Sequence, residues 1–128
     1  MSVQIQLTPL QLASLIGVNL LAFAASLGMA FNIDAIVLSF DSTNTVAGLV
    51  ASVELAAIAA GNLTFAKLAT RMSAQRTFFV GIVIIVCLNL ASVMVPSTDW
   101  LIACRAPAGF ALGAVVATVM TTAGRSHK

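Results

Sequence analysis

Three ionisable residues, Asp34, Glu54 and Arg105, stand inside long apolar stretches of the sequence. A charge near the centre of a bilayer costs at least about 2.5–3.5 kcal/mol, so such residues usually face a partner or a water-filled cavity. At about 1.5 Å of rise per residue, Glu54 lies roughly 12 Å and Arg105 roughly 8 Å below the start of its stretch. Two carboxylates and a guanidinium in the same half of a membrane predict a site that couples to protons or a ligand. The alternatives are a fixed ion pair that only holds helices together and, for Asp34, a place among the lipid headgroups.

Four apolar segments must position these residues, and they take up nearly the whole chain. The 128 residues are 60% hydrophobic and 8% charged, whereas soluble domains are about 45–50% apolar and about 25% charged. A helix needs about 20 apolar residues to cross a bilayer. We therefore predict an all-α, polytopic membrane protein in which residues 1–128 form four transmembrane helices, at 10–38, 46–66, 77–95 and 100–123.

The positive charges favour one orientation in the membrane. Lys67, Arg71 and Arg76 follow the second segment, and Arg125 and Lys128 follow the fourth, while the other two gaps hold no cation. The positive-inside rule places both termini in the cytoplasm, as in an integral protein of a bacterial inner (plasma) membrane. The net charge of only +2 gives no support for binding nucleic acid.

Small residues predict close helix packing. One recurs every four positions from Gly48 to Ala60, and Gly109 and Gly113 repeat this spacing in the last segment. Small residues let helix backbones approach closely in lipid, and intramembrane asparagines such as Asn89 are expected to hydrogen-bond between helices.

Enzyme chemistry has no basis in the sequence. The single histidine, His127, stands one residue from the end, and no nucleophile–base pair, metal-ligand spacing or phosphate-binding loop accompanies it. We expect no enzyme activity, no metal and no cofactor.

The loop after the second segment, LATRMSAQR at 68–76, resembles the G-x-L-A-D-R-x-G-R-R loop between the second and third helices of the major facilitator superfamily. The identities and the trailing positive charge are supplied by Leu68, Ala69, Arg71 and Arg76. Thr70 replaces the aspartate of that loop and Ser73 its second glycine. In the family, the aspartate and arginine form a conformational latch against neighbouring helix ends.

Two further stretches extend the resemblance. Arg105 and Gly109 match the R-x-x-x-G motif of the family's fourth helix, whose arginine interacts with the proton-carrying acid in proton-coupled members. Asp34, in the stretch NIDA, resembles the aspartate near the end of the first helix in the drug:proton antiporter branch. The resemblance implies that Asp34, together with Glu54, binds protons and that Arg105 tunes this binding.

The family also implies a longer protein. Its members have about twelve helices in two six-helix halves, so the chain resembles the first four helices of the N-terminal half and is expected to be an N-terminal fragment or a truncated product. The expected function is transport of a small organic solute coupled to protons. The expected partners are the lipid bilayer, the solute, protons, and either the missing helices or another membrane chain.

Two other functions fit the same segments. The first is a small four-helix multidrug exporter acting as a dimer, although such exporters carry their glutamate in the first helix and Glu54 lies in the second. The other is a membrane subunit or remnant that does not transport and packs against a partner.

Overall fold

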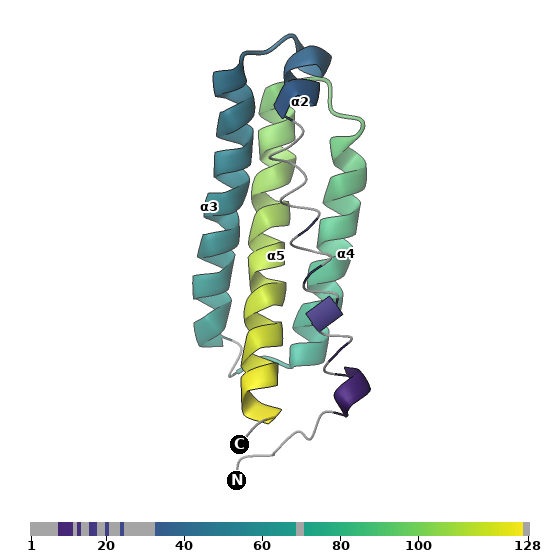
Figure 1. Cartoon of the computed structure of the whole chain (residues 1–128), viewed down its shortest axis with the longest axis vertical. Coiled ribbons are helices and arrows are strands. Elements are labelled where there is room, and N and C mark those ends of the chain that lie inside the picture. The colour runs from purple at the N-terminus through teal and green to yellow at the C-terminus, as the bar shows by residue number, and fades with distance from the viewer. Residues whose placement is uncertain are drawn as a thin grey trace.

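The computed structural model describes residues 8–11, 13, 16–17, 20, 24, 33–68 and 71–126. Its elements are α2 (Ile33–Phe40), α3 (Asn44–Leu68), α4 (Ala74–Ser92) and α5 (Thr98–Ser126). The part of the chain that is described contains helices and no strand, which confirms the all-α prediction. The three long helices run alongside one another and α2 lies at one end of them (Figure 1).

Three of these helices are long and apolar enough to cross a membrane: α3, α4 and residues Thr98–Gly124 of α5. They correspond to the segments predicted at 46–66, 77–95 and 100–123. The first predicted segment, 10–38, lies mostly outside the described residues, and α2 contains its last part. The structure therefore supports a membrane protein with three spans, and four spans are not shown.

Helix α5 occupies the centre of the bundle. Both α3 and α4 pack against it, and 61% of its span is buried, against 28% for α3 and 11% for α4. Consecutive residues from Ala111 to Val119 are all buried. A helix that is buried all round is a core element, so α5 is the element on which α3 and α4 are positioned.

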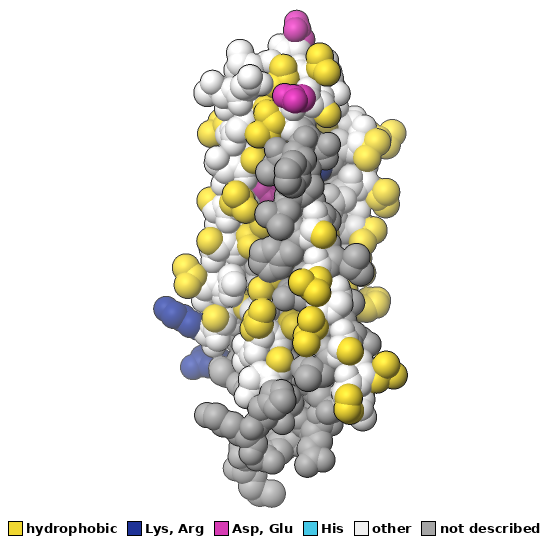
Figure 2. Space-filling view, viewed as in Figure 1, with side chains coloured by type: hydrophobic (Ala, Val, Ile, Leu, Met, Phe, Trp, Pro, Cys, Tyr) yellow, Lys and Arg dark blue, Asp and Glu magenta, His cyan; other side chains and the backbone are white. Residues whose placement is uncertain are grey.

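The outer surfaces of the helices are apolar. Large exposed side chains include Leu49, Leu63, Phe79, Leu90 and Met120, and Figure 2 shows hydrophobic side chains spread over the described part of the visible face. In water each square ångström of this surface would cost about 25 cal/mol. In a bilayer the lipid tails contact it at no such cost.

Hydroxyl groups inside the spans donate to their own helices. Ser52 donates to the carbonyl of Gly48 at 2.8 Å, and Thr118 donates to that of Ala114 at 2.8 Å. This bond to the preceding turn satisfies a polar group where no water is present. The spans therefore carry serine and threonine without needing a partner for them on another helix.

Two local signals explain where helices begin and end. Ser73 is the N-cap of α4, because its Oγ accepts from the backbone N–H of Arg76 at 3.2 Å. Asp41 follows α2 with a φ of 47°, and the N–H of Ser42 donates to the carbonyl of Val37 at 3.1 Å. This is the hydrogen bond of a Schellman turn, which requires a left-handed residue at the position of Asp41.

The alternating direction of the long helices separates the charges. Lys67, Arg71 and Arg76 lie where α3 ends and α4 begins, which we call the basic end. Asp41 and Asp99 lie at the opposite, acidic end, before α3 and in the first turn of α5. Figure 2 shows acidic side chains near α2 and basic ones toward the other end, with further charged atoms visible between the two ends.

Candidate functional site

A buried cluster joins the three long helices through Glu54, Asn89 and Arg105. Nη1 of Arg105 lies 3.8 Å from Oε1 of Glu54 and donates to Oδ1 of Asn89 at 3.2 Å. Glu54 is only 5% exposed, and the side chain of Arg105 is 19% exposed. The structure therefore brings together two of the three ionisable residues that the sequence singled out, and it adds Asn89.

The orientation of Asn89 is fixed by its own helix. Its Nδ2 donates to the carbonyl of Ile85 at 2.9 Å, so its Oδ1 is the atom that faces Arg105. An amide has one acceptor and one donor end, and this arrangement uses each of them once. The expected interhelical hydrogen bond of Asn89 is thus present, with Arg105 as its partner.

Arg105 has hydrogen-bonding capacity that the cluster does not use. A guanidinium carries five N–H donors, and one terminal nitrogen contacts both Glu54 and Asn89. Its Nε is buried and has no hydrogen-bond partner among the described residues. The contacts to Glu54 and Asn89 therefore leave donors of Arg105 unused.

Glycines of α5 allow the close approach that makes this cluster. A Cβ on Gly109 would lie 2.6 Å from the carbonyl oxygen of Glu54 and 3.3 Å from its Cγ. A Cβ on Gly113 would collide with the carbonyl of Ile58 and lie 2.7 Å from the backbone nitrogen of Asn62. One turn beyond Arg105, then, the backbone of α5 rests directly on the turn of α3 that carries Glu54.

The glycine that α3 contributes to this crossing is Gly61, which lies outside the series of small residues predicted to pack. A Cβ there would meet the carbonyl of Phe110 on α5. The small residues predicted to pack, which recur from Gly48 to Ala60, do not lie in this contact. Ser52, Ala56 and Ala60 are exposed, and a Cβ on Gly48 would have nothing within 4 Å. The buried face of α3 consists of Ala47, Val50, Glu54, Ile58 and Gly61.

Asp34 lies apart from this cluster. It is exposed in the first turn of α2, a helix that packs mainly on α3. Within the described residues, the recorded ion pair of Arg105 is with Glu54. The structure thus places Glu54, and not Asp34, at the arginine.

The loop that resembles the family motif is described in part. Leu68 is the last residue of α3, and its carbonyl accepts from the N–H of Arg71 at 2.9 Å. Ala69 and Thr70 lie outside the described residues. Arg71 and Arg76 are exposed, and Ser73, at the position of the family's second glycine, caps α4.

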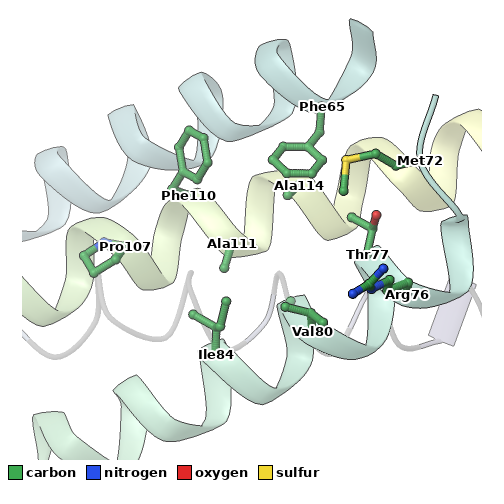
Figure 3. A pocket seen from close by; sticks show the side chains of 11 residues that line it. Phe65, Met72, Arg76, Thr77, Val80, Ile84, Pro107, Phe110, Ala111 and Ala114 are labelled. Atoms are coloured by element: carbon green, nitrogen blue, oxygen red, sulfur yellow. The ribbon is translucent and has the colours of Figure 1, made fainter. Parts of the chain in front are cut away.

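A separate cavity of about 650 Å³ lies nearer the basic end (Figure 3). The rings of Phe65 and Phe110 meet edge to face there, with centroids 6.1 Å apart. The cavity is lined by Phe65, Met72, Arg76, Thr77, Val80, Gly81, Ile84, Pro107, Phe110, Ala111 and Ala114. The sequence carries no signal for this cavity, because apolar residues that line a cavity have the same pattern as residues that face lipid.

Comparison of the chain with protein-family models, curated protein sequences and solved structures finds no match. The resemblance to the major facilitator superfamily therefore stays a prediction from the sequence. Within the described part of the chain, no group of three or more His, Cys, Asp or Glu residues could hold a metal ion.

Proposed function

We propose that this chain takes part in proton-coupled transport of a small organic solute across a membrane, as part of a secondary transporter of the major facilitator type. The observation that carries the proposal is the pairing of Glu54 with Arg105 between two membrane helices. Intramembrane acidic residues are typical of proton pathways in transporters. The resemblance of the Arg105 and Gly109 region to the family's R-x-x-x-G motif supports the choice of transporter type.

In the proposed mechanism, Glu54 is the proton-binding group and Arg105 its competitor. A proton on Glu54 cancels the carboxylate charge and removes its attraction to the guanidinium. Arg105 then keeps its hydrogen bond to Asn89 and is available to an acceptor on the solute. Proton binding to Glu54 and solute binding to Arg105 are thereby linked through one guanidinium. Each binding event changes the free energy of the other by the same amount, which is the coupling free energy between the two ligands.

The helix crossing supplies the moving part of this mechanism. α3 and α5 approach each other closely through Gly61, Gly109 and Gly113, beside the packed side chains of Ile58, Leu112 and Val116. The ion pair adds an attraction between the same two helices. When Glu54 is protonated, α3 and α5 lose this attraction and can shift along the glycine contact, as alternating access requires.

Other parts of the proposal rest on predictions from the sequence. Asp34, exposed on α2, is proposed as a second proton-binding group. Loss of transport by Asp34→Asn would support that role. The basic end is proposed to face the cytoplasm of a bacterial cell, in keeping with the positive-inside rule. Further helices, from the same or another membrane chain, would complete the solute site, because family members place it between two halves.

The test is proton-driven transport in liposomes that contain the chain together with the membrane helices or partner chain that complete its solute site. Ethidium serves as the probe solute, and an imposed pH gradient drives its accumulation. We expect Glu54→Gln to abolish accumulation, because the amide cannot take up the proton. Asp41→Asn is the matched control, since it removes an exposed carboxylate outside the cluster and asparagine tolerates the left-handed conformation. Equal accumulation by the wild type and Glu54→Gln would refute the proposed role of Glu54.

A further inference from the structure

The cavity at the basic end has an apolar body and one cationic end. Its walls come from the end of α3, the first half of α4 and the middle of α5. Figure 3 shows Met72, Arg76 and Thr77 together at one end and Pro107 at the other. A ligand that fits such a space has a long apolar part and an anionic head.

The polar side chains that line the cavity lie at that cationic end. Thr77 is buried, and its hydroxyl already donates to the carbonyl of Ser73 at 3.2 Å. The guanidinium of Arg76 is exposed, and among the described residues it has no recorded carboxylate partner. Arg76 is therefore the group at this cavity that can bind an anion.

The stretch of sequence around the cavity carries positive charges and no acidic residue. Residues 55–98 contain three cations, Lys67, Arg71 and Arg76, and no Asp or Glu. Lys and Arg near a membrane surface attract anionic lipids. The charge at this end is thus complementary to an anionic headgroup.

The length of the cavity matches one lipid leaflet. Along α4 its lining extends from Arg76 to Ile84, a rise of roughly 12 Å at about 1.5 Å per residue. Half of a hydrocarbon core about 30 Å thick is about 15 Å. An acyl chain that enters beside Arg76 would therefore reach most of the way to the bilayer midplane within this cavity.

We propose that this cavity binds an anionic phospholipid, with one acyl chain between α4 and α5, beside Phe65 of α3, and the phosphate at Arg76. Most of the lining residues belong to α4 and α5, so the lipid would lie against these two helices at the basic end. Glu54 and Arg105 are not among the cavity's lining residues. The proposal is therefore independent of the transport function proposed above.

Native mass spectrometry of the detergent-purified chain tests it, with phosphatidylglycerol, phosphatidylcholine and inorganic phosphate as probes. We expect one phosphatidylglycerol per chain, bound at least fivefold more tightly than phosphatidylcholine, and no displacement by inorganic phosphate. Arg76→Gln should weaken phosphatidylglycerol about fivefold, the equivalent of about 1 kcal/mol. The control Arg71→Gln, exposed at the same basic end and outside the cavity, should change it less than twofold.

A second pair of variants tests the cavity itself. Val80 lines it and is 48% exposed, whereas Val83, on the same helix, is 44% exposed and does not line it. Val80→Trp should abolish the bound lipid, and Val83→Trp should retain it. Equal binding of both lipids, equal effects of the two tryptophans, or displacement by inorganic phosphate would overturn the proposal. A chain dimer that Val80→Trp dissociates would also overturn it, because the occupant would then be a second copy.

Discussion

At the scale of single residues, Arg105 is the residue on which the proposed mechanism depends. It contacts an acid on one neighbouring helix and an amide on the other, so its position depends on both. The sequence showed Arg105 and Glu54 as costly residues in apolar segments, because a charge in such a segment is visible from composition alone. It could not show which acid Arg105 contacts, since that depends on how α3 is rotated about its axis.

Removing one charge of the pair should harm folding more than removing both. Arg105→Gln removes the recorded ion pair of the buried Glu54, and breaking a buried pair by removing one partner typically costs about 3–5 kcal/mol. The double variant Glu54→Gln/Arg105→Gln has neither charge and should recover much of that loss. Thermal unfolding in detergent measures the cycle, and additive effects of the two substitutions would show that the residues do not interact.

The hydrogen bond of Asn89 should contribute modestly to stability. Interhelical hydrogen bonds in membranes average about 0.6 kcal/mol, so Asn89→Leu should lower the free energy of unfolding by about that amount. Its effect on proton-driven ethidium accumulation should be larger, because Arg105 loses the contact that keeps it in place when Glu54 is protonated. A variant with full transport would contradict this positioning role.

At the scale of the elements, α5 determines where α3 and α4 lie. The apolar segments of the sequence predicted the three long helices to within a few residues, because hydropathy and segment length are enough to locate a membrane helix. The helix ends were less predictable, since they depend on single residues such as the Ser73 cap and the left-handed Asp41. The face on which α3 packs was not predictable from its small residues, which occur on more than one side of the helix.

The glycine contact between α3 and α5 should be intolerant of a single methyl group. Gly113→Ala would place a carbon against the carbonyl of Ile58, which forces the helices apart and should destabilise the bundle by about 1–3 kcal/mol, as overpacking does. Gly48→Ala is the matched control, because a Cβ there meets nothing within 4 Å. Equal melting temperatures for the two variants would contradict the observed crossing.

The cap of α4 should be worth about 1 kcal/mol. Ser73→Ala removes the acceptor for the N–H of Arg76, and loss of an N-cap costs about 0.5–2 kcal/mol. Ser52→Ala serves as the control, since its hydroxyl bonds only to its own helix. Thermal unfolding should separate the two variants, and an unchanged melting temperature for Ser73→Ala would argue against the cap.

At the scale of the whole molecule, the charges divide the chain into a basic and an acidic end. The apolar exterior between them was foreseeable from composition, since a chain with 60% hydrophobic residues has more apolar surface than its interior can hold. The cavity was not foreseeable, because it depends on the spacing of α3 and α4 around α5. The membrane orientation follows only from the positive-inside rule and is open to direct measurement.

Cysteine labelling should report that orientation. Cys87 and Cys104 are free and would first be replaced by serine. In that background, Arg71→Cys at the basic end should react with a membrane-impermeant maleimide only from the cytoplasmic side. Asp41→Cys at the acidic end should react only from the outside, and the opposite pattern would reverse the proposed topology.

The central claim is that Glu54 exchanges a proton inside the membrane under the control of Arg105. Infrared difference spectroscopy of the protein in liposomes, recorded across pH, detects a buried carboxyl group as it takes up a proton. We expect a reversible carboxyl band that Glu54→Gln abolishes, that Asp41→Asn retains, and that Arg105→Gln moves to a different pH. A spectrum in which Glu54→Gln leaves every carboxyl band in place would contradict the account.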